Sequence, residues 1–394
     1  MAQFRNGCIA PNSVALHIYI RYRKGMGLSC GIVGLPNVGK STIFNALTRT
    51  GERAGAEVQN YPFCTIDPNV GIVPVPDPRL QRIAEIIKPQ AILPTVLEVV
   101  DIAGLVKGAS QGEGLGNKFL NHIRQVQAII HVVRCFEDSN IIHVDGKIDP
   151  LRDMDVIHME LALADLDSVE KRIAKNEKLL KSGDKNAKEE IAFLTLVREK
   201  LNTGESLLQL SMSEDQRILL TKELSLMSAK PVLYVANVSE SQLLKTSEAI
   251  QKIEAAAKSR GGNMVQICGK IEDELASLAF EERQDFLREL GIAEPGLHQL
   301  IRFGYTLLEL ITFFTAGEKE VRAWTLKKGL KAPQAAGVIH SDFERGFIRA
   351  ETYHYDDLIK YKSEAAVRAQ GLMRLEGKDY IVKDGDIMHF RFNV

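Results

Sequence analysis

The stretch GLPNVGKS at residues 34–41 matches the pattern G-x-x-x-x-G-K-[ST] of a phosphate-binding loop. The apolar run Gly31–Val33 precedes it, and a helical pattern that begins at Thr42 follows it. The glycines let backbone N–H groups converge on phosphate oxygens at the positive end of the helix. We expect Lys40 to reach the β- and γ-phosphates and the Ser41 hydroxyl to ligate Mg²⁺. The stretch therefore predicts a strand, a phosphate loop and a helix, in that order.

Four more short apolar runs follow along the chain and alternate with helical patterns. Runs rich in Val and Ile, separated by helices, indicate strands that are buried on both faces of a mostly parallel sheet. Ligands bind at the carboxyl ends of such strands. We therefore expect a doubly wound α/β domain with its site at that edge. The four runs are residues 96–100, 129–133, 232–236 and 265–267.

Oxygen-bearing side chains lie where a nucleotide-bound Mg²⁺ would need them. Asp101 ends the second apolar run in the sequence DIAG, so its carboxylate can hold Mg²⁺ through water, and the Gly104 N–H can meet the γ-phosphate. Thr65 lies in the loop after the first helix, where a threonine hydroxyl can complete the Mg²⁺ shell. Taken alone, Thr65 would be an ordinary loop residue. The predicted metal ligands are thus Ser41, Thr65 and, through water, Asp101.

The sequence lacks the glutamine that usually positions the attacking water in Ras-like enzymes. Leu105 follows Gly104 where Ras-like enzymes place a catalytic glutamine, and a leucine cannot orient water. His143 falls in the loop after the 129–133 run, on the nucleotide side of the sheet. A structural and a catalytic role are equally open for it, whereas His131, within a strand pattern, is expected to be a core residue. The predicted catalytic residues are His143 and Lys40.

Two further loops occupy the places where GTP-binding switches carry the base-reading sequences NKxD and SAK. The aspartate of NKxD accepts the N1 and N2 hydrogens of guanine, whereas adenine offers an N6 donor and a bare N1 acceptor. Glu240 would make no such pair with adenine, so Asn237 and nearby backbone would read N6 and N7 while Val238 packs on the base. The loop favours ATP and leaves GTP open. The predicted ATP-binding residues are Gly34, Asn37, Val38, Gly39, Lys40, Ser41, Thr42, Gly104, Asn237, Val238, Glu240, Cys268 and Gly269.

Residues 155–230 interrupt the α/β pattern. Apolar side chains recur at three- and four-residue spacing from Met159 to Leu180, and the pattern resumes from Leu194 to Leu208 after a glycine-containing turn. Two such stripes predict an antiparallel helical hairpin that projects as a coiled-coil arm. A plain structural arm and a partner-docking arm are both compatible with the pattern.

The sequence changes character from about residue 304. The run 321–326 predicts a strand, and Pro333 can open a short helix over 334–340. Asp384-Gly385 between 380–383 and 386–390 is a typical two-residue hairpin signal. We expect a small mixed α+β module.

Composition excludes several classes of protein. The 394 residues suggest two or three domains, and 45% hydrophobic with 26% charged residues is typical of a globular protein. A net charge of −1 excludes a histone-like polybasic protein. The five scattered cysteines, without CxxC spacing, argue for a reducing compartment and against a zinc cluster. The apolar stretch 300–314 contains Arg302 and Glu309, so we expect no membrane span and a cytoplasmic protein.

The first 25 residues are basic, and no acidic residue precedes Glu52. Such a segment is either an organelle presequence or an over-long gene start, with the true start at Met26. In both cases we expect it to be poorly ordered and exclude it from the fold argument.

Several strings together resemble the YchF subfamily of Obg-related P-loop NTPases, from about Met26 to Val394. The resemblance implies a Ras-like P-loop NTPase domain (an OBG-type G domain, 26–154 and 231–303) interrupted by the coiled-coil arm (155–230). A ubiquitin-like TGS domain (304–394) follows. The strings are GLPNVGKS at 34–41, NYPFCT at 60–65, DIAGLVKGA at 101–109, GEGLG at 112–116 and NVSE at 237–240.

The resemblance also implies an activity: slow hydrolysis of ATP to ADP and phosphate, with ATP preferred over GTP. It implies that Leu105 replaces the catalytic glutamine, that His143 helps hydrolysis instead, and that Asn37 is associated with a K⁺ ion. Such an ion could supply positive charge where an arginine finger would otherwise act.

The partner that the resemblance implies is the ribosome. Its large- and small-subunit RNA and proteins would be contacted through the TGS domain and the arm. Lys327, Lys328, Lys331, Arg345 and Arg349 could form a basic face for rRNA phosphates, although a merely solvated surface is at least as compatible with the balanced charge of the tail. Nothing demands a dimer, so we expect a monomer. A GTP-driven translational switch and a nucleotide-stabilised adaptor are the rival functions.

Overall fold

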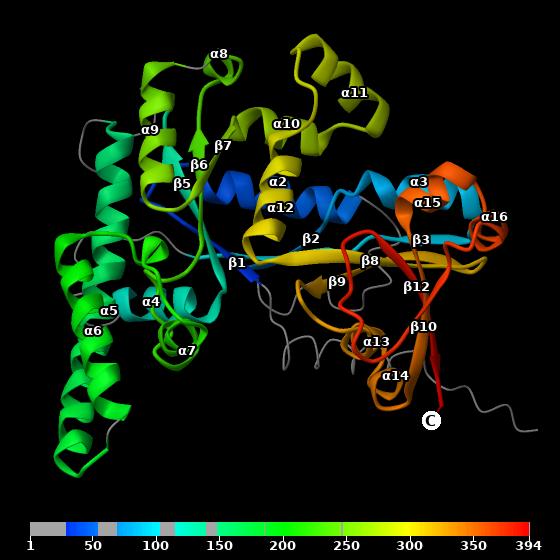
Figure 1. Ribbon diagram of the computed structural model, residues 1–394. Helices are drawn as coiled ribbons and strands as arrows, with labels where there is room; N and C mark the ends of the chain where they lie inside the picture. Colours follow the sequence, from blue (N-terminus) through cyan, green and yellow to red (C-terminus); the bar gives the residue numbers. More distant parts are fainter. Residues whose placement is uncertain are drawn as a thin grey trace, which may run out of the picture. The chain divides into compact units, whose positions relative to one another are not determined.

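The computed structural model describes residues 29–53, 69–102, 115–138, 148–184, 186–245 and 247–393 (Figure 1). The predictions for the N-terminal segment and for Thr65, Gly104, Leu105 and His143 lie outside these ranges. The described chain forms two compact units by its contacts. The nucleotide unit contains residues 29–49 and 97–308, and the C-terminal unit contains residues 50–96 and 309–394.

Parallel strands form the centre of the nucleotide unit. They are β1 (Ser29–Val33), β4 (Val96–Asp101), β5 (Ala128–Arg134), β6 (Val232–Asn237) and β7 (Asn263–Ile267), in the order β4-β1-β5-β6-β7. All residues of β1 and β5 are buried, including the polar residues Ser29, His131 and Arg134 among their apolar side chains. The strand order reverses at β1, so the carboxyl end of β1 is the place where a doubly wound sheet binds its ligand. The five predicted strands are confirmed.

Helices cover this sheet and complete the core. They are α2 (Lys40–Arg53), α4 (Leu115–Gln125), α8 (Glu240–Leu243), α9 (Glu248–Ser259), α10 (Gly269–Ser277), α11 (Phe280–Glu289) and α12 (Gly296–Leu307). Both α9 and α12 pack against β6 and β7. Ile253 of α9 and Leu275 of α10 are buried in one cluster with Val133 and Ala236 of the strands. Apolar helix faces therefore bury the strand faces, as expected for a doubly wound fold.

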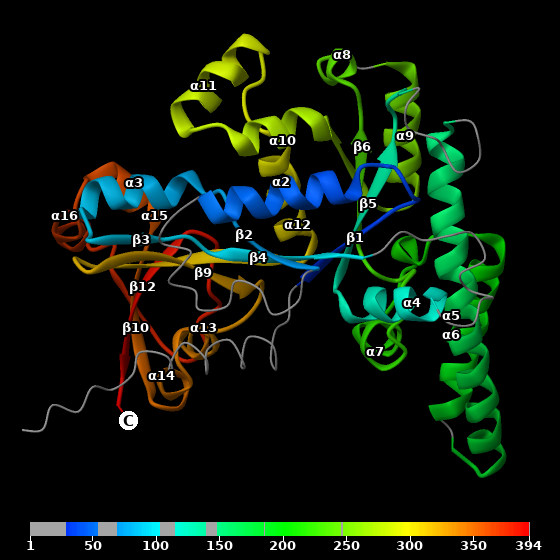
Figure 2. The ribbon, with the colours of Figure 1, turned by 180° about the vertical axis from the view of Figure 1, so that it is seen from behind.

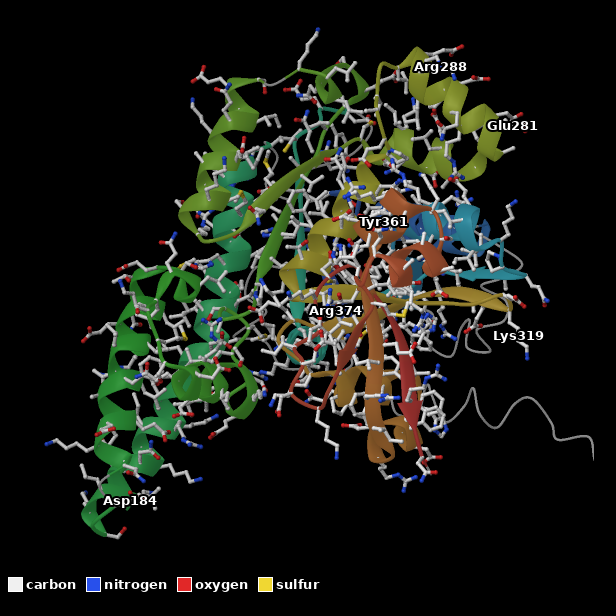
Figure 3. The ribbon with its side chains drawn as sticks, turned by 45° about the vertical axis from the view of Figure 1, so that its right-hand side comes forward. Asp184, Glu281, Arg288, Lys319, Tyr361 and Arg374 are labelled. Carbon is white, nitrogen blue, oxygen red and sulfur yellow. The ribbon has the colours of Figure 1, made fainter. Side chains whose placement is uncertain are left out.

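A helical hairpin extends from the sheet, with Asp184 at its far tip (Figures 2 and 3). It consists of α5 (Pro150–Lys181) and α6 (Asn186–Thr203), followed by η2 (Leu207–Gln209), α7 (Glu214–Ile218) and η3 (Leu219–Glu223). Val169 and Val197 are fully buried between the helices, which confirms the predicted stripes. Met159 and Leu180 were expected in the same stripe but are 42% and 40% exposed. Leu180 lies in the last turn of α5, beside the hairpin tip, and Met159 lies in the part of α5 that extends beyond the shorter α6.

Buried polar contacts fasten the arm to the sheet. Asp165 of α5 accepts hydrogen bonds from the N–H groups of Met227 (3.0 Å) and Ser228 (2.7 Å). Two residues later, the Lys230 ammonium donates to three carbonyls at the end of α4, those of Ile123, Arg124 and Val126. The last carbonyls of a helix have no hydrogen-bond donor within the helix, so the ammonium supplies the missing donors. Burial lowers the pKa of Lys230 to about 8, against the raising effect of Asp165.

The C-terminal unit is built on a second, mixed sheet. Its strands are β3 (Ala91–Leu93), β8 (Leu310–Ala316), β9 (Glu320–Lys327), β10 (Phe347–His354), β11 (Arg374–Glu376) and β12 (Asp386–Phe392), in the order β11-β10-β12-β8-β9-β3. Its other elements are β2 (Val70–Pro74), α3 (Pro78–Ile87), α13 (Ala332–Ile339), α14 (Ser341–Arg345), α15 (Tyr355–Tyr361) and α16 (Glu364–Ala369). β9 and the proline-initiated α13 confirm the predicted strand and helix.

Residues 69–96 group with the C-terminal unit, whereas the family resemblance implies that they belong to the NTPase domain. Strand β3 pairs in parallel with β9 and extends the second sheet. Leu80 and Ile83 of α3 are buried with Phe314 and Tyr353 of that sheet. The apolar face of α3 therefore supports the C-terminal unit, and the predicted domain limits differ from the contact-defined units at this segment.

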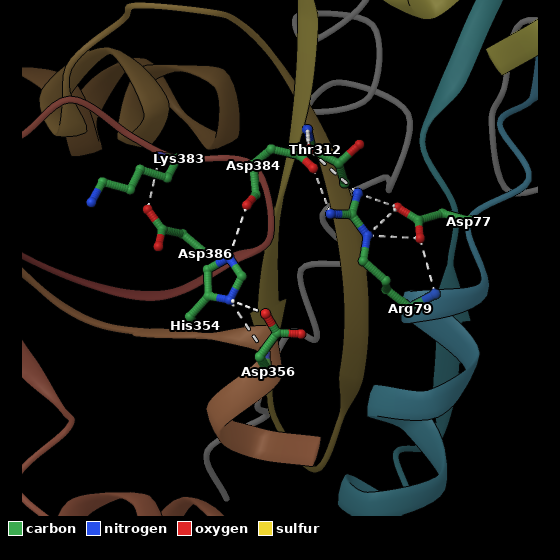
Figure 4. Close-up of polar contacts among 8 residues, drawn as sticks. All are labelled: Asp77, Arg79, Thr312, His354, Asp356, Lys383, Asp384 and Asp386. Atoms are coloured by element: carbon green, nitrogen blue, oxygen red, sulfur yellow. Dashed lines mark hydrogen bonds and ion pairs between the residues drawn. The ribbon is translucent and has the colours of Figure 1, made fainter. Parts of the chain in front are cut away.

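The hairpin predicted at Asp384-Gly385 is wrong. Residues 380–383 form only an isolated bridge, and the neighbours of β12 are β10 and β8. Asp384 accepts from the Arg79 guanidinium (Nη1–Oδ2 2.6 Å) and from the Thr312 N–H (2.8 Å), and Gly385, with φ of 88°, donates to the Thr312 carbonyl (2.8 Å; Figure 4). These contacts anchor the turn on β8 and α3, so it leads the chain into β12 instead of folding it back.

Among the described residues, no helix combines the length and the apolar character that crossing a membrane requires.

Candidate nucleotide-binding site

The loop between β1 and α2 has a conformation that two of its glycines make possible. Gly34 has a φ of +155°, and a Cβ there would lie 2.5 Å from the Val132 carbonyl oxygen. Gly39 has a φ of +96°, and a Cβ there would collide with the Asn237 amide. A side chain at either position would force the loop away from β5 or β6. The structure thus confirms the predicted strand, loop and helix. The loop backbone lies directly before the N-terminus of α2.

The Lys40 side chain folds across this loop. Its ammonium donates to the Leu35 carbonyl (2.8 Å), and the residue is 8% exposed. Burial lowers the pKa of Lys40, while the nearby Asp101 carboxylate opposes the shift. A positive charge held over the loop could neutralise phosphate oxygens that the loop N–H groups would bind.

Asp101 and Ser41 form an oxygen pair beside Lys40. Asp101 ends β4 opposite Ile32 of β1, and the Ser41 hydroxyl lies 3.5 Å from Asp101 Oδ2. Asp101 Oδ1 is buried and has no hydrogen-bond partner among the described residues. Burial raises the pKa of Asp101, against the lowering effects of Lys40 and Ser41. A hydroxyl and a carboxylate with an unused buried oxygen fit the hard, oxygen-preferring Mg²⁺ ion. Thr65, the third predicted ligand, lies outside the described residues.

The amide of Asn237, at the end of β6, joins two loops of the site. Its Nδ2 donates to the Val38 carbonyl (2.9 Å), and its Oδ1 accepts from the Gly269 N–H (3.0 Å). Only this orientation of the amide satisfies both neighbours, because one is an acceptor and the other a donor. Asn237 is 4% exposed, and its two hydrogen bonds clamp the phosphate loop to the start of α10. One amide hydrogen and one lone pair remain for the base-reading role predicted from the sequence.

Some of the other residues predicted to bind the nucleotide are buried, and others are exposed. Val238 and Cys268 are 2% and 3% exposed, and burial raises the pKa of the Cys268 thiol. Glu240, the first residue of α8, is exposed and makes no hydrogen bond or ion pair with any described residue. Thr42 and Asn37 are also exposed, and Asn37 adopts a φ of 61°, a conformation that asparagine tolerates better than most residues. The loops thus come together, with the Glu240 side chain in solvent.

Sequence reasoning missed Glu272, one turn beyond the Cys268–Gly269 loop. Its carboxylate is buried and accepts from the N–H groups of Gly296 (2.7 Å) and Leu297 at the start of α12. Burial raises the pKa of Glu272 to about 7, although both N–H groups oppose the shift. The carboxylate therefore fixes α10, and with it the Cys268–Gly269 loop, to α12. An acidic residue in the first helical turn was the only signal in the sequence, and it does not identify the partner.

Comparisons with known proteins agree with this geometry. A family model described as a 50S ribosome-binding GTPase matches residues 29–166, and a YchF-GTPase C-terminal model, described as a protein of unknown function, matches residues 310–393. The ribosome-binding ATPase YchF of Bacillus subtilis is 56% identical over 371 residues, which cover 94% of this chain and 100% of that protein. The protein of the same name from Escherichia coli O157:H7 is 56% identical over 369 residues, with the same coverage.

Solved structures give the same result. The Schizosaccharomyces pombe YchF GTPase superposes with a TM-score of 0.83 at 42% identity, covering 93% of this chain and 98% of that one. A GTP-binding protein from Pyrococcus horikoshii, at 20% identity and a TM-score of 0.57, shares the fold. With a phosphate loop, a helical arm and a C-terminal α+β domain in the same order, and with relatives more than half identical along nearly the whole chain, this protein belongs to the YchF family of P-loop NTPases.

Proposed function

We propose that this chain is an Mg²⁺-dependent ATPase of low intrinsic rate that associates with the ribosome. The observation that carries the proposal is the group formed by Lys40, Ser41 and Asp101 at the mouth of the phosphate loop, where a cation, a hydroxyl and an unsatisfied carboxylate oxygen lie together. The curated relatives are named ribosome-binding ATPases, which supports both halves of the proposal.

The roles of the residues follow from charge and position. The loop N–H groups and Lys40 bind the phosphates, and Ser41 and Thr65 hold Mg²⁺ with Asp101 behind a water. The Gly104 N–H meets the γ-phosphate. When bound, Mg²⁺ would neutralise charge on the β- and γ-phosphate oxygens. The proposal assigns the chain mainly positioning and charge stabilisation, as in other phosphoryl-transfer sites.

We assign the positioning of the attacking water to His143, because Leu105 cannot do it. A K⁺ ion at Asn37 would add positive charge at the loop. His143→Ala should lower turnover by about 10²–10⁴ and leave ATP affinity unchanged. Single-turnover hydrolysis in K⁺ and in Na⁺, next to equilibrium ATP binding, measures both quantities. Unchanged turnover would remove His143 from the mechanism, and equal rates in the two salts would remove K⁺.

ATP is the proposed substrate because the loop after β6 lacks the NKxD aspartate, and Glu240 lies in solvent. GTP is the second candidate, since the Schizosaccharomyces pombe relative and the family model that matches residues 29–166 are both described as GTPases. A wrong base would leave polar groups unpaired at about 1–3 kcal/mol each, which a titration with both nucleotides resolves.

A partner-binding adaptor, stabilised by nucleotide and indifferent to hydrolysis, is the remaining alternative. Lys40→Ala should abolish nucleotide binding under either function, whereas His143→Ala tells them apart. If the hydrolysis-deficient variant retains ribosome binding and cellular function, the adaptor is correct. We place the protein in the cytoplasm as a monomer, with the C-terminal domain and the arm as its ribosome contacts.

A further inference from the structure

The basic face predicted for the C-terminal module is largely neutralised. Lys331 forms an ion pair with Asp379 (2.7 Å), and Arg345 pairs with Asp342 one turn earlier in α14. Lys327 lies 3.9 Å from Glu309. These cations are compensated by carboxylates of their own module.

A different set of arginines gathers on one face of the β11-β10-β12 sheet. Arg349 of β10 is directly opposite Arg391 of β12, and Glu351 lies two residues further along the same face of β10. Arg368 of α16 reaches this face from outside the sheet. Its Nη2 lies 2.9 Å from Glu351 Oε2, and Arg391 Nε and Nη2 are each 3.2 Å from Oε1. Two guanidinium groups therefore bind one carboxylate, and a third, that of Arg349, belongs to the residue opposite Arg391.

One contact within this arrangement is unfavourable. Like charges directly opposite each other in an antiparallel pair repel, and Arg349 and Arg391 are such a pair. Glu351 is 12% exposed, and both of its oxygens are engaged by Arg368 and Arg391, which lower its pKa. Arg349 is exposed and makes no ion pair with any described residue.

The nearby Glu364 carboxylate reduces the positive charge of the cluster but does not cancel it. Glu364, the next acid on this face, is bound by His389 (2.7 Å) and by the Tyr353 hydroxyl. The side chains of Arg368 and Arg391 are 63% and 61% exposed, so their remaining N–H donors face solvent. Glu351 thus holds two guanidinium groups in place without neutralising the cluster.

We propose that Arg349, Arg368 and Arg391 bind phosphates of an RNA backbone. The inference rests on the proposed ribosome association and adds the residues and the chemistry of one contact. A guanidinium presents a rigid fork of donors that matches phosphate oxygens, and two forks on paired strands lie close enough to share one phosphate. Leu375 of β11, opposite Glu351 and 62% exposed, offers an apolar surface beside them for a sugar or base.

The test compares the double variant Arg349→Gln/Arg391→Gln with the wild-type protein. Co-sedimentation with purified ribosomes is measured between about 50 and 200 mM KCl, where counterion release makes phosphate contacts visible. We expect affinity to fall at least about tenfold at the lower salt, and the slope of log affinity against log salt to become shallower by about 1.5–2. Arg345→Gln, an exposed arginine of the same module, is the matched control and should leave the slope unchanged.

Two controls separate this contact from folding and from catalysis. The double variant removes the repulsion between the facing arginines and also the solvent-exposed ion pair of Arg391 with Glu351. These two effects oppose each other, so the melting temperature should stay close to that of the wild type, whereas a structural role for the arginines would lower it clearly. Basal ATP hydrolysis should be unchanged, because none of the three arginines lies in the candidate nucleotide site.

Deproteinised ribosomal RNA is the second probe. If the arginines bind RNA, the double variant loses affinity for this RNA as well. A loss seen only with intact ribosomes would assign the site to an acidic protein and overturn the proposal. Ribosome binding with unchanged affinity and slope would also overturn it, while leaving ribosome association intact. If wild-type protein fails to bind ribosomes, the proposed association fails, and the naked RNA still tests the arginines.

Discussion

Replacing Asn237 should loosen the phosphate loop and the start of α10 together, because one buried amide holds both. Asn237→Ala removes the hydrogen bonds to the Val38 carbonyl (2.9 Å) and from the Gly269 N–H (3.0 Å). Each buried backbone group left unsatisfied costs about 1–3 kcal/mol, so the variant should lose about 3 kcal/mol once water enters the gap. For a unit of this size, that corresponds to a fall in melting temperature of about 6–12 °C.

A second variant separates the two contacts. Asn237→Asp keeps an acceptor for the Gly269 N–H but turns an oxygen toward the Val38 carbonyl, so the phosphate-loop contact becomes repulsive. We expect both variants to weaken ATP binding, measured by equilibrium titration, and to melt earlier in a thermal-shift assay. Asn45→Ala, at an exposed position of α2, is the matched control. If Asn237→Ala melts and binds ATP as wild type does, the clamp described here does not exist.

Three further changes test the buried polar groups. Lys230→Met leaves three carbonyls of α4 and its C-terminal loop unpaired, so the free energy of unfolding should fall by about 3 kcal/mol. An unaltered melting temperature would contradict a stabilising role for the Lys230 hydrogen bonds. Burial raises the pKa of Glu272 from 4.5 to about 7, so the folded protein keeps a proton that the unfolded chain loses in that window. Stability should therefore fall by up to about 3 kcal/mol as the pH rises from about 4.5 to 7, and Glu272→Gln should remove this dependence; parallel curves would show that Glu272 does not titrate there. Gly39→Ala should abolish nucleotide binding, because its Cβ would displace the Asn237 amide; retained ATP affinity would refute this.

Much of the fold follows from local pattern. The fully buried strand β5 is rich in Val and Ile, so its composition indicates burial on both faces, whereas more and less buried residues alternate in β4 and β7. The phosphate loop needs glycine at fixed positions, and the arm repeats its apolar residues at helical spacing. Such signals arise between residues within about ten positions of each other, so a single sequence is enough to show them.

Contacts between distant segments are not visible in such patterns. The three residues of β3 carry too little pattern to indicate that they join the second sheet. Asp384-Gly385 has typical hairpin chemistry, yet Arg79, far earlier in the chain, binds Asp384 and redirects the turn. The sequence also placed Asn237 in the base loop but could not indicate that Val38 and Gly269 share its amide.

The proposed function depends most on this family member binding and hydrolysing ATP in preference to GTP. A side-by-side equilibrium titration of the purified full-length protein with ATP and GTP, in Mg²⁺ with either K⁺ or Na⁺, tests it most directly. We predict that ATP binds at least about tenfold more tightly, a difference of about 1.4 kcal/mol. Tighter binding of GTP would contradict the interpretation of the 237–240 loop and identify a GTP-driven switch instead.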